Sequence, residues 1–158
     1  MPFSYAKSGM PGAETTSVAV VDASVAVKWV VDEPDSKTAA AFLEGPIRWI
    51  APRLMLVEAA ATLRRKVVQR ELRAIGAAAS LRTLLDAARE GVIRLFEDEQ
   101  LVDIALLLAL ELDHKVPDCL YLALAEREGC SLCTADRTLA RIARARRVDV
   151  LGVGAARA

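Results

Sequence analysis

Short apolar runs alternate with longer segments of helical periodicity along most of this chain. Ser17–Val21 is a short, mainly β-branched run, which is the pattern of a strand buried on both faces of a sheet. Further strands are expected at Arg48–Ala51, Gly91–Phe96, Cys130–Thr134 and near Val148–Val153.

Between these runs, apolar residues recur at the spacing of one helix face. Leu54, Val57, Ala61 and Val68 repeat in this way from Pro52 to about Arg70, and Arg73–Glu90 continues the pattern, which predicts a helical hairpin. Further helices are expected at Ala23–Val31, from Asp35 or Ser36 to Glu44–Gly45, and at Gln100–Leu112, Pro117–Glu128 and Arg137–Arg146. Strands that alternate with helices indicate an α/β fold, a three-layer α/β/α sandwich with a central, mainly parallel sheet of four or five strands.

The length of 158 residues is that of one domain with a core of its own. Met1–Thr16 contains two glycines and two prolines without periodicity, so we expect a flexible leader there. Residues 17–158 are then expected to form the folded domain.

Composition narrows the function classes. The chain is 54% hydrophobic but only 4% aromatic, which favours packed helices on a small aliphatic sheet over a β-sandwich. Lysine plus arginine equals aspartate plus glutamate at 21 each, so RNA binding would depend on local patches. Two basic runs are candidates: Arg64, Arg65, Lys66, Arg70 and Arg73, and then Arg137, Arg141, Arg144, Arg146 and Arg147.

Cysteine usage and hydropathy indicate a cytoplasmic protein. Three cysteines without a secretory signal argue for a reducing compartment. The longest apolar run, Ile104–Leu110, is far shorter than the ~20 residues that span a bilayer. Cys130 and Cys133 have C-x-x-C spacing, but a redox motif should open a helix and these two lie on an expected strand.

Four acidic residues stand where an open parallel sheet gathers its ligands. Asp22 and Asp136 follow two of the expected strands, Asp118 follows Pro117 at a helix start, and Glu58 lies in the first turns of a helix. Carboxylates forced together raise each other's pKa unless a cation compensates. Oxygen ligands select hard ions such as Mg²⁺ or Mn²⁺, which activate water for attack on a phosphodiester.

The chain contains four segments, Val21–Val30, Leu54–Arg64, Pro117–Gly129 and Leu132–Leu139, that resemble, in the same order, segments of one known family, the PIN-domain toxins of the VapBC toxin–antitoxin modules. Val21-Asp-Ala-Ser-Val-Ala-Val-Lys-Trp-Val30 resembles the family's opening segment, and Leu54–Arg64 resembles the helix with its second acid. Pro117–Gly129 followed by Leu132–Leu139 looks like the third and fourth acids, and the spacing from Asp118 to Thr-Ala-Asp136 is the most specific of these matches.

This resemblance implies a type II toxin ribonuclease that cleaves RNA with metal-activated water. It assigns the metal to Asp22, Glu58, Asp118 and Asp136, and it places Ser24 beside the metal or the scissile phosphate. It also implies a homodimer and an antitoxin, whose helix we expect in an apolar groove between the first helices and the one at Leu54–Arg70. One departure is that Arg137 and Thr138 stand where some relatives have a further polar or acidic residue.

Each candidate also has a structural explanation. Asp22, Asp136 and Ser24 could each cap a helix. Asp118 could be stabilised in a first helical turn by the helix dipole. Glu58 could be a solvated helix residue, and we expect His114 to be solvated in a loop. The alternative functions are a catalytically inactive PIN-like binding module and a metal-dependent DNA nuclease. A phosphatase is disfavoured because Ser24 stands where a DxD loop has its second aspartate.

Overall fold

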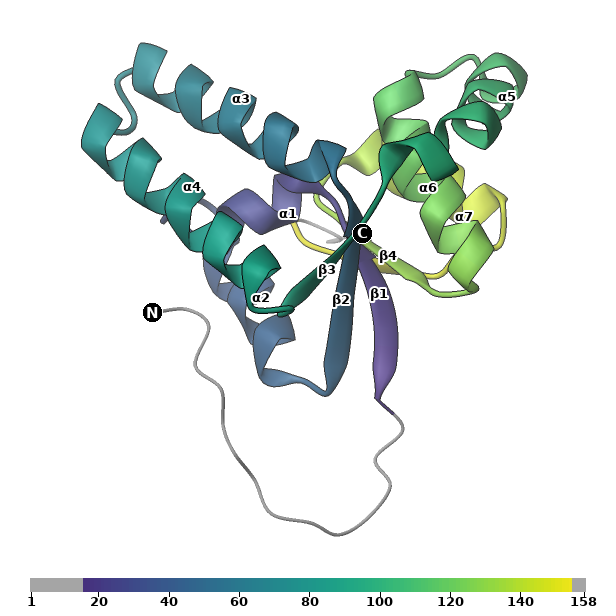
Figure 1. The fold of residues 1–158 in the computed structure, drawn as a ribbon, viewed down its shortest axis with the longest axis horizontal. Coiled ribbons are helices and arrows are strands. Elements are labelled where there is room, and N and C mark those ends of the chain that lie inside the picture. Colours follow the sequence, from purple (N-terminus) through teal and green to yellow (C-terminus); the bar gives the residue numbers. More distant parts are fainter. Residues whose placement is uncertain (1–15, 155–158) are drawn as a thin grey trace, which may run out of the picture.

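Five short parallel strands form the single sheet of this computed structural model, which describes residues 16–154 (Figure 1). The strands are β1 (Ser17–Val21), β2 (Ile47–Pro52), β3 (Ile93–Phe96), β4 (Ser131–Thr134) and β5 (Val150–Gly152). Their order across the sheet is β3-β2-β1-β4-β5, and every neighbouring pair is parallel. The predicted parallel sheet is confirmed, with five strands.

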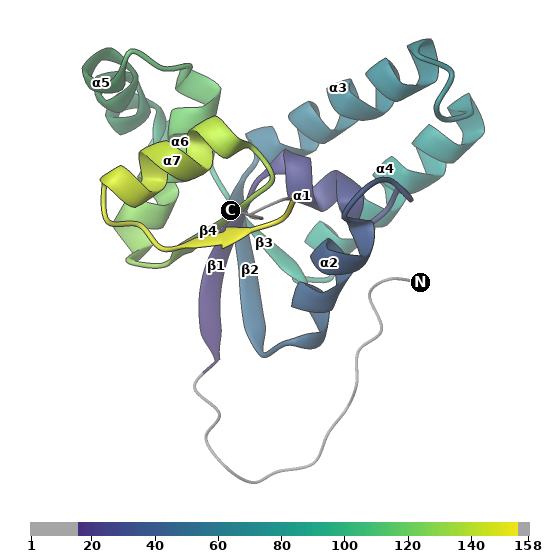
Figure 2. The same cartoon turned by 180° about the vertical axis from the view of Figure 1, so that it is seen from behind.

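Helices connect the strands and cover the sheet. They are α1 (Ala23–Lys28), α2 (Ser36–Ala41), α3 (Leu54–Val68), α4 (Ala74–Arg89), α5 (Val102–Leu112), α6 (Val116–Glu128) and α7 (Arg137–Ala145), with 3₁₀ turns η1 (Phe42–Glu44) and η2 (Asp98–Gln100). The chain first steps from β1 towards β3 and later crosses back to β4 and β5, so right-handed connections place α1–α4 and α5–α7 on opposite faces. Figures 1 and 2 show these two groups of helices on opposite sides of the carboxyl ends of the strands.

The reversal of direction places a crevice between β1 and β4. These strands are neighbours, with Val20 opposite Leu132 and Val21 opposite Cys133. Asp22 extends the ladder by donating its backbone N–H to the carbonyl of Cys133 at 3.1 Å. Because the connections leave this pair in opposite directions, their carboxyl ends are where a doubly wound sheet binds ligands.

Aliphatic side chains and two tryptophans make up the core. Val20, Val21, Leu122 and Leu132 are completely buried. Trp29 and Trp49 pack edge to face with ring centroids 5.0 Å apart, which is a favourable aromatic geometry. Tyr121 is also buried, so three of the aromatic residues in the described part of the chain belong to the core.

The predicted first helix ends early. We expected Ala23–Val31, but α1 stops at Lys28, with Trp29 as its C-cap residue. The Lys28 ammonium donates to the Pro34 carbonyl at 2.8 Å and closes the turn that follows. Asp35 is the N-cap residue of α2 but makes no side-chain capping bond.

The remaining expected elements occur within a few residues of their predicted limits. Of the expected leader Met1–Thr16, all but Thr16 lies outside the described residues, as do the last four residues of the domain. Across residues 16–154, no helix is both long and apolar enough to cross a membrane.

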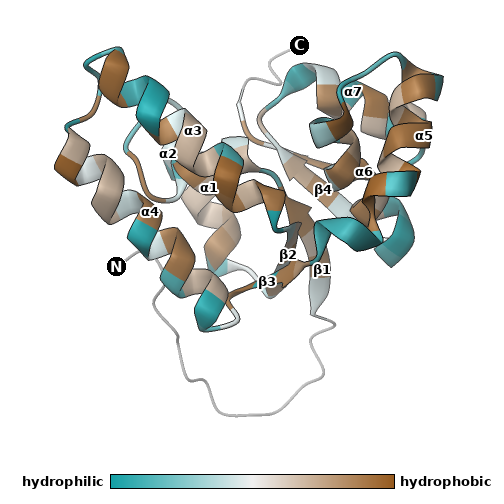
Figure 3. Cartoon of the chain, turned by 45° about the horizontal axis from the view of Figure 1, so that its top comes forward, coloured by the Kyte–Doolittle hydropathy of each residue, from teal (hydrophilic) through white to brown (hydrophobic). Residues whose placement is uncertain are grey.

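Helix α5 consists mainly of apolar residues (Figure 3), and several of them are exposed. Leu107 and Leu110 are 67% and 73% exposed, and Val102, Ile104 and Leu106 are exposed beside them. Aliphatic side chains grouped on one helix face are a feature of protein-binding surfaces.

Candidate active site

Four acids from four separate segments line one cavity of about 330 Å³ at the carboxyl ends of β1 and β4. Asp22 follows β1, Glu58 lies in the second turn of α3, Asp118 in the first turn of α6, and Asp136 between β4 and α7. The structure therefore brings together all four acids that the sequence singles out. Ser24 lines the same cavity.

Asp22 is the most buried of these acids, with 4% of its surface exposed. Its two carboxylate oxygens accept hydrogen bonds from the hydroxyls of Ser24 and Thr134, each at 2.5 Å, and from the backbone N–H of Val25 at 3.2 Å. Burial nevertheless raises the pKa of Asp22 to about 6, with a further contribution from the charge of Asp136. A carboxylate that stays costly to ionise despite three hydrogen bonds is suited to a cation.

Ser24 and Thr134 join the two strand ends. Ser24 accepts the backbone N–H of Ala135 at 3.0 Å, and Thr134 accepts the N–H of Asp136 at 2.9 Å. Both hydroxyls thus donate to Asp22 while they hold the β4–α7 turn beside it. The capping role considered for Ser24 is wrong, because Asp22 is the N-cap residue of α1.

Asp136 caps a helix and still faces the cavity. Its Oδ1 accepts the backbone N–H groups of Thr138 at 2.8 Å and Leu139 at 3.0 Å. Within the described part of the chain, Oδ2 accepts no hydrogen bond. The capping explanation for Asp136 is therefore correct but incomplete, since one oxygen remains for another ligand.

Glu58 is half-buried and is held by Tyr121. The Tyr121 hydroxyl donates to Glu58 Oε2, and its ring is 1% exposed. Burial raises the pKa of Glu58, and the negative charges of Asp118 and Asp98 raise it further, against the lowering effect of the tyrosine hydrogen bond. The sequence interpretation missed Tyr121, although it follows Asp118 by three residues and is the single hydroxyl in the buried run from Cys119 to Ala125.

Asp118 lies beside a histidine that we expected in solvent. The His114 side chain is only 13% exposed, and its Nε2 is 2.8 Å from Asp118 Oδ2, while Lys115 Nζ is 3.4 Å from the same oxygen. The expectation of a solvated His114 is wrong, because its backbone N–H bonds to the Ala109 carbonyl at 3.0 Å and folds the loop back onto α5. Asp118 Oδ2 and His114 Nε2 are both buried and neither makes a hydrogen bond, although Asp118 Oδ2 lies within ion-pair distance of His114 and Lys115.

The donor set of the cavity fits a divalent metal. All four acids offer oxygen, which hard ions prefer, and the buried Asp118 Oδ2 has no hydrogen-bonding partner. In the arrangement seen across residues 16–154, no three His, Cys, Asp or Glu side chains are close enough to ligate one ion together. A metal held by three or more of these carboxylates would therefore require them to lie closer together than they do in this structure.

The C-x-x-C pair takes no part in this site. Cys130 and Cys133 are free thiols, and Cys133 lies within β4, as expected. Burial raises the pKa of Cys133 to about 12, so the thiolate needed for redox chemistry does not form near neutral pH.

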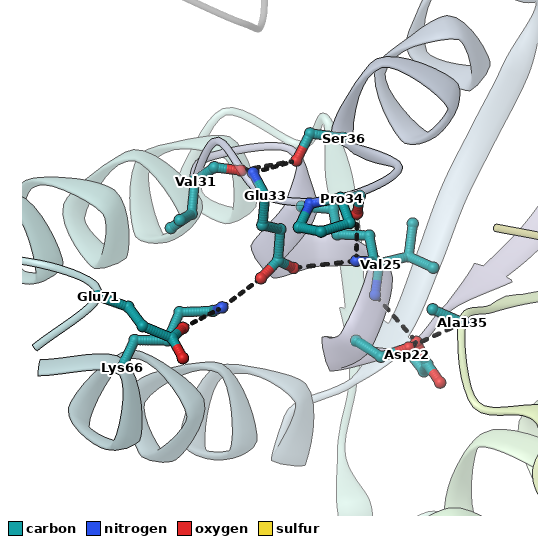
Figure 4. Close-up of polar contacts among 11 residues, drawn as sticks. Asp22, Val25, Val31, Glu33, Pro34, Ser36, Lys66, Glu71 and Ala135 are labelled. Carbon is teal, nitrogen blue, oxygen red and sulfur yellow. Dashed lines mark hydrogen bonds and ion pairs between the residues drawn. The ribbon is translucent and has the colours of Figure 1, made fainter. Parts of the chain in front are cut away.

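A basic wall completes the cavity on the side of α1 and α3. It consists of Lys28, Arg65 and Lys66, with Glu33 between the two lysines. Glu33 accepts Lys28 Nζ at 3.2 Å and pairs with Lys66, which also lies 3.3 Å from Glu71 (Figure 4). These ion pairs fasten the loop after α1 to α3.

The family profile of the PIN domain matches residues 19–145, and this range contains all four acids. The chain belongs to the PIN domain family. Members of this family are typically metal-dependent nucleases.

Solved structures share the fold of this PIN domain at low sequence identity. PAE2754 from Pyrobaculum aerophilum is 23% identical, with a TM-score of 0.58 over 90% of this chain and 93% of that one. A toxin–antitoxin complex from Klebsiella pneumoniae is 15% identical, with a TM-score of 0.56 over 77% and 89% of the two chains. VapBC2 from Rickettsia felis, bound to a promoter DNA fragment, is 11% identical, with a TM-score of 0.58 over 87% and 99%. A comparison with curated protein sequences finds no match.

Proposed function

We propose that this PIN domain is a divalent-metal-dependent endoribonuclease that acts as the toxin of a cytoplasmic toxin–antitoxin pair. The observation that carries the proposal is the convergence of Asp22, Glu58, Asp118 and Asp136 on one cavity at the switch point of the sheet. Burial raises the pKa of Asp22 and of Glu58, and strongly perturbed pKa values are characteristic of functional sites. The family and its fold neighbours in toxin–antitoxin complexes support the biological role.

In this proposal the four acids hold Mg²⁺ or Mn²⁺. When bound, the ion supplies a more acidic water for attack on the phosphodiester and stabilises the negative charge that develops. The protein positions the side chains that would hold the ion. Ser24 and Thr134 fix both oxygens of Asp22, and Tyr121 orients Glu58. Ligands whose orientation is fixed by such hydrogen bonds bind a metal ion more tightly.

Protein partners are the second part of the proposal. The exposed aliphatic face of α5 is suited to another protein, either a second copy of the chain or the antitoxin. A separate hollow of about 510 Å³ lies between α1, α2 and α4 and includes Trp29, Val30 and Val31 in its lining. This hollow against α4 is a second candidate for an antitoxin helix, beside the groove that we expected against the Leu54–Arg70 helix.

The proposal is tested by cleavage of a mixed pool of structured RNA in Mg²⁺, Mn²⁺ or EDTA. Parent protein is compared with the Asp22→Asn and Asp118→Asn variants, and a single-stranded DNA pool of matched length runs in parallel. We expect metal-dependent cleavage of RNA that both variants lose.

The other outcomes separate the alternatives. Cleavage of DNA in preference to RNA would establish a DNA nuclease. Absence of cleavage by a protein that folds and binds RNA would indicate a binding module. Equal cleavage by the parent and both variants would mean that a contaminating nuclease is responsible.

A further inference from the structure

One face of α3 runs from the acids to the outer rim of the cavity. Glu58, Thr62 and Arg65 all line the cavity, and their spacing of four and then three residues keeps them on the same side of the helix. Arg65 is seven residues beyond Glu58, which corresponds to about 10 Å along the helix axis. The helix therefore places a cation at a fixed distance from the acid cluster.

Arg65 differs from the other two cations of the basic wall. Lys28 is engaged by Glu33 and the Pro34 carbonyl, and Lys66 by Glu33 and Glu71. Both lysine side chains are only 14% exposed. Their charges are thus compensated within the protein and are poorly placed for an external anion.

The Arg65 side chain is exposed and has no ion pair or hydrogen bond with any residue between 16 and 154. Among the cations that line the cavity in the described chain, its charge alone is uncompensated. A guanidinium can bind a phosphate through two parallel hydrogen bonds. It also stands near four carboxylates, where a polyanionic strand needs an attractive contact to approach.

We propose that Arg65 binds a backbone phosphate of the substrate strand next to the one that is cleaved. This inference rests on the proposed ribonuclease function and adds to it a residue that positions the strand. The scissile phosphate lies at the acids, and the strand continues along α3 past Thr62 to Arg65. The contact is to the backbone, so it contributes affinity and register without base preference.

Arg65 is the only arginine of the two basic runs that lines the cavity in the described part of the chain. Arg64, Arg70 and Arg73 do not line the cavity. Nor does any arginine of the second run, in which Arg146 and Arg147 line a hollow at the opposite edge of the sheet. Arg64 is a matched control, because it has the same charge and exposure on the same helix but is turned about 100° away from Arg65.

The test compares Arg65→Gln and Arg64→Gln in the full-length protein on a single-stranded RNA that the parent cleaves. KM and kcat are measured in Mg²⁺ from about 50 to about 200 mM KCl, a range over which phosphate contacts weaken strongly. We expect Arg65→Gln to raise KM about tenfold, to leave kcat within about twofold, and to reduce the salt dependence of log KM by about 0.7 per phosphate contact. Arg65→Lys should recover part of the affinity, and Arg64→Gln should match the parent.

Binding of the same RNA, labelled with a fluorophore and measured by anisotropy in Ca²⁺, supplies a readout that does not depend on turnover. Equal effects of the two arginine variants would overturn the inference in favour of general electrostatic attraction, as would an unchanged KM in Arg65→Gln. A loss confined to kcat would also overturn it. Failure of the proposed function is distinguishable, because the parent protein itself would then cleave no RNA.

Discussion

The two edges of the sheet both carry charged hollows, but they differ in how their charges are compensated. At the amino edge, a hollow of about 630 Å³ includes Glu126, Arg146 and Arg147 in its lining. Arg146 pairs there with Glu126 at 2.5 Å and with Glu111 at 3.0 Å. At the carboxyl edge, the cavity is about half that volume and is lined by five acids, of which only Glu33 is paired with the lysines of the basic wall.

The difference teaches that neither the size of a hollow nor its number of charges marks the active site. The glutamates at Arg146 raise the pKa of its guanidinium, so that each charge there stabilises the other. At the carboxyl edge, burial and like charges raise the pKa of Asp22 and Glu58. Acids that remain costly to ionise in the folded protein identify the edge where a cation should bind.

The largest expected effect is the loss of activity on replacing an acid at the carboxyl edge, compared with an acid at the amino edge. Asp118→Asn should lower ribonuclease activity at least about a thousandfold, or ~4 kcal/mol, because it removes a metal ligand. Glu126→Gln at the amino edge should leave kcat/KM within about twofold. The measurement is initial cleavage rate at saturating Mg²⁺, with thermal unfolding to verify that both variants fold. Comparable losses in the two variants would contradict the assignment of the site to the carboxyl edge.

The second prediction concerns stability against pH in EDTA. The pKa of Asp22 is about 6 in the folded protein, against an ordinary value of 3.8 that applies to the unfolded chain. Between these two pH values, the folded protein keeps a proton on Asp22 that the unfolded chain has lost. The free energy of unfolding should therefore fall as pH rises from about 4 to about 6, by up to ~3 kcal/mol from Asp22. Above about pH 6 this contribution should no longer change. Urea denaturation between pH 4 and pH 8 measures it.

Asp22→Asn is the control for the pH prediction, because the amide has the same shape and does not titrate. The difference in unfolding free energy between parent and variant should shift in favour of the variant as pH rises from about 4 to about 6. Mg²⁺ should stabilise the parent more at pH 7 than at pH 5, since it compensates the ionised form. Parallel pH profiles of parent and Asp22→Asn would show that Asp22 is not the group responsible.

Much of the fold and the positions of the acids could be predicted from the sequence because they follow from local patterns. A β-branched run predicted β1 at its observed limits, and the strand end determines where Asp22 lies. The helical spacing of Leu54, Val57, Ala61 and Val68 predicted a helix where α3 lies, with Glu58 near its start. It did not predict the buried face, because Val57 and Val68 are exposed and the helix packs through Met55, Ala59 and Leu63. The carboxyl ends of parallel strands meet at one edge, so convergence of the acids followed from topology.

The partners of these acids could not be predicted, because they depend on packing between distant segments. Tyr121 reaches Glu58 across 63 positions of the sequence, and Thr134 reaches Asp22 across 112. His114 is an exception in distance, because it is a loop residue only four positions before Asp118, and its contact depends on the turn after α5. Similarly, the basic run that contains Arg65 gives no indication of which member faces the cavity until α3 is oriented by its contacts with α1 and α4.

Tyr121→Phe tests whether such a distant partner matters to the site. The substitution removes the hydroxyl that donates to Glu58 but keeps the buried ring. We expect Mg²⁺ affinity to fall roughly tenfold, or ~1.4 kcal/mol, because a ligand loses its orienting hydrogen bond. Titration of Mg²⁺ followed by activity and by calorimetry measures the change. Unchanged affinity in a folded variant would reduce Tyr121 to a packing role.

The smallest expected effect is that of Glu33→Gln, which tests whether the basic wall is structural. Burial alone would raise the pKa of Glu33, but hydrogen bonds and charge from Lys66 and Lys28 outweigh it and lower the pKa. The ion pairs therefore stabilise the fold above the ordinary glutamate pKa of 4.5, and this stabilisation is lost as pH falls below it. At pH 7 the variant should lose about 1 kcal/mol, a modest figure because the pairs retain some solvent.

Urea denaturation of the parent and Glu33→Gln at pH 7 and near pH 3.5 measures this contribution, with Glu126→Gln as the amino-edge counterpart. The deficit of Glu33→Gln should shrink at the lower pH, because the parent's carboxylate is then protonated as well. If the deficit stays constant with pH, it arises from packing of the side chain and not from its charge. A different result would be that Glu33→Gln is as stable as the parent and has a lower KM for RNA. Lys28 and Lys66 would then be available to the substrate, and the basic wall would offer more cations than Arg65 alone.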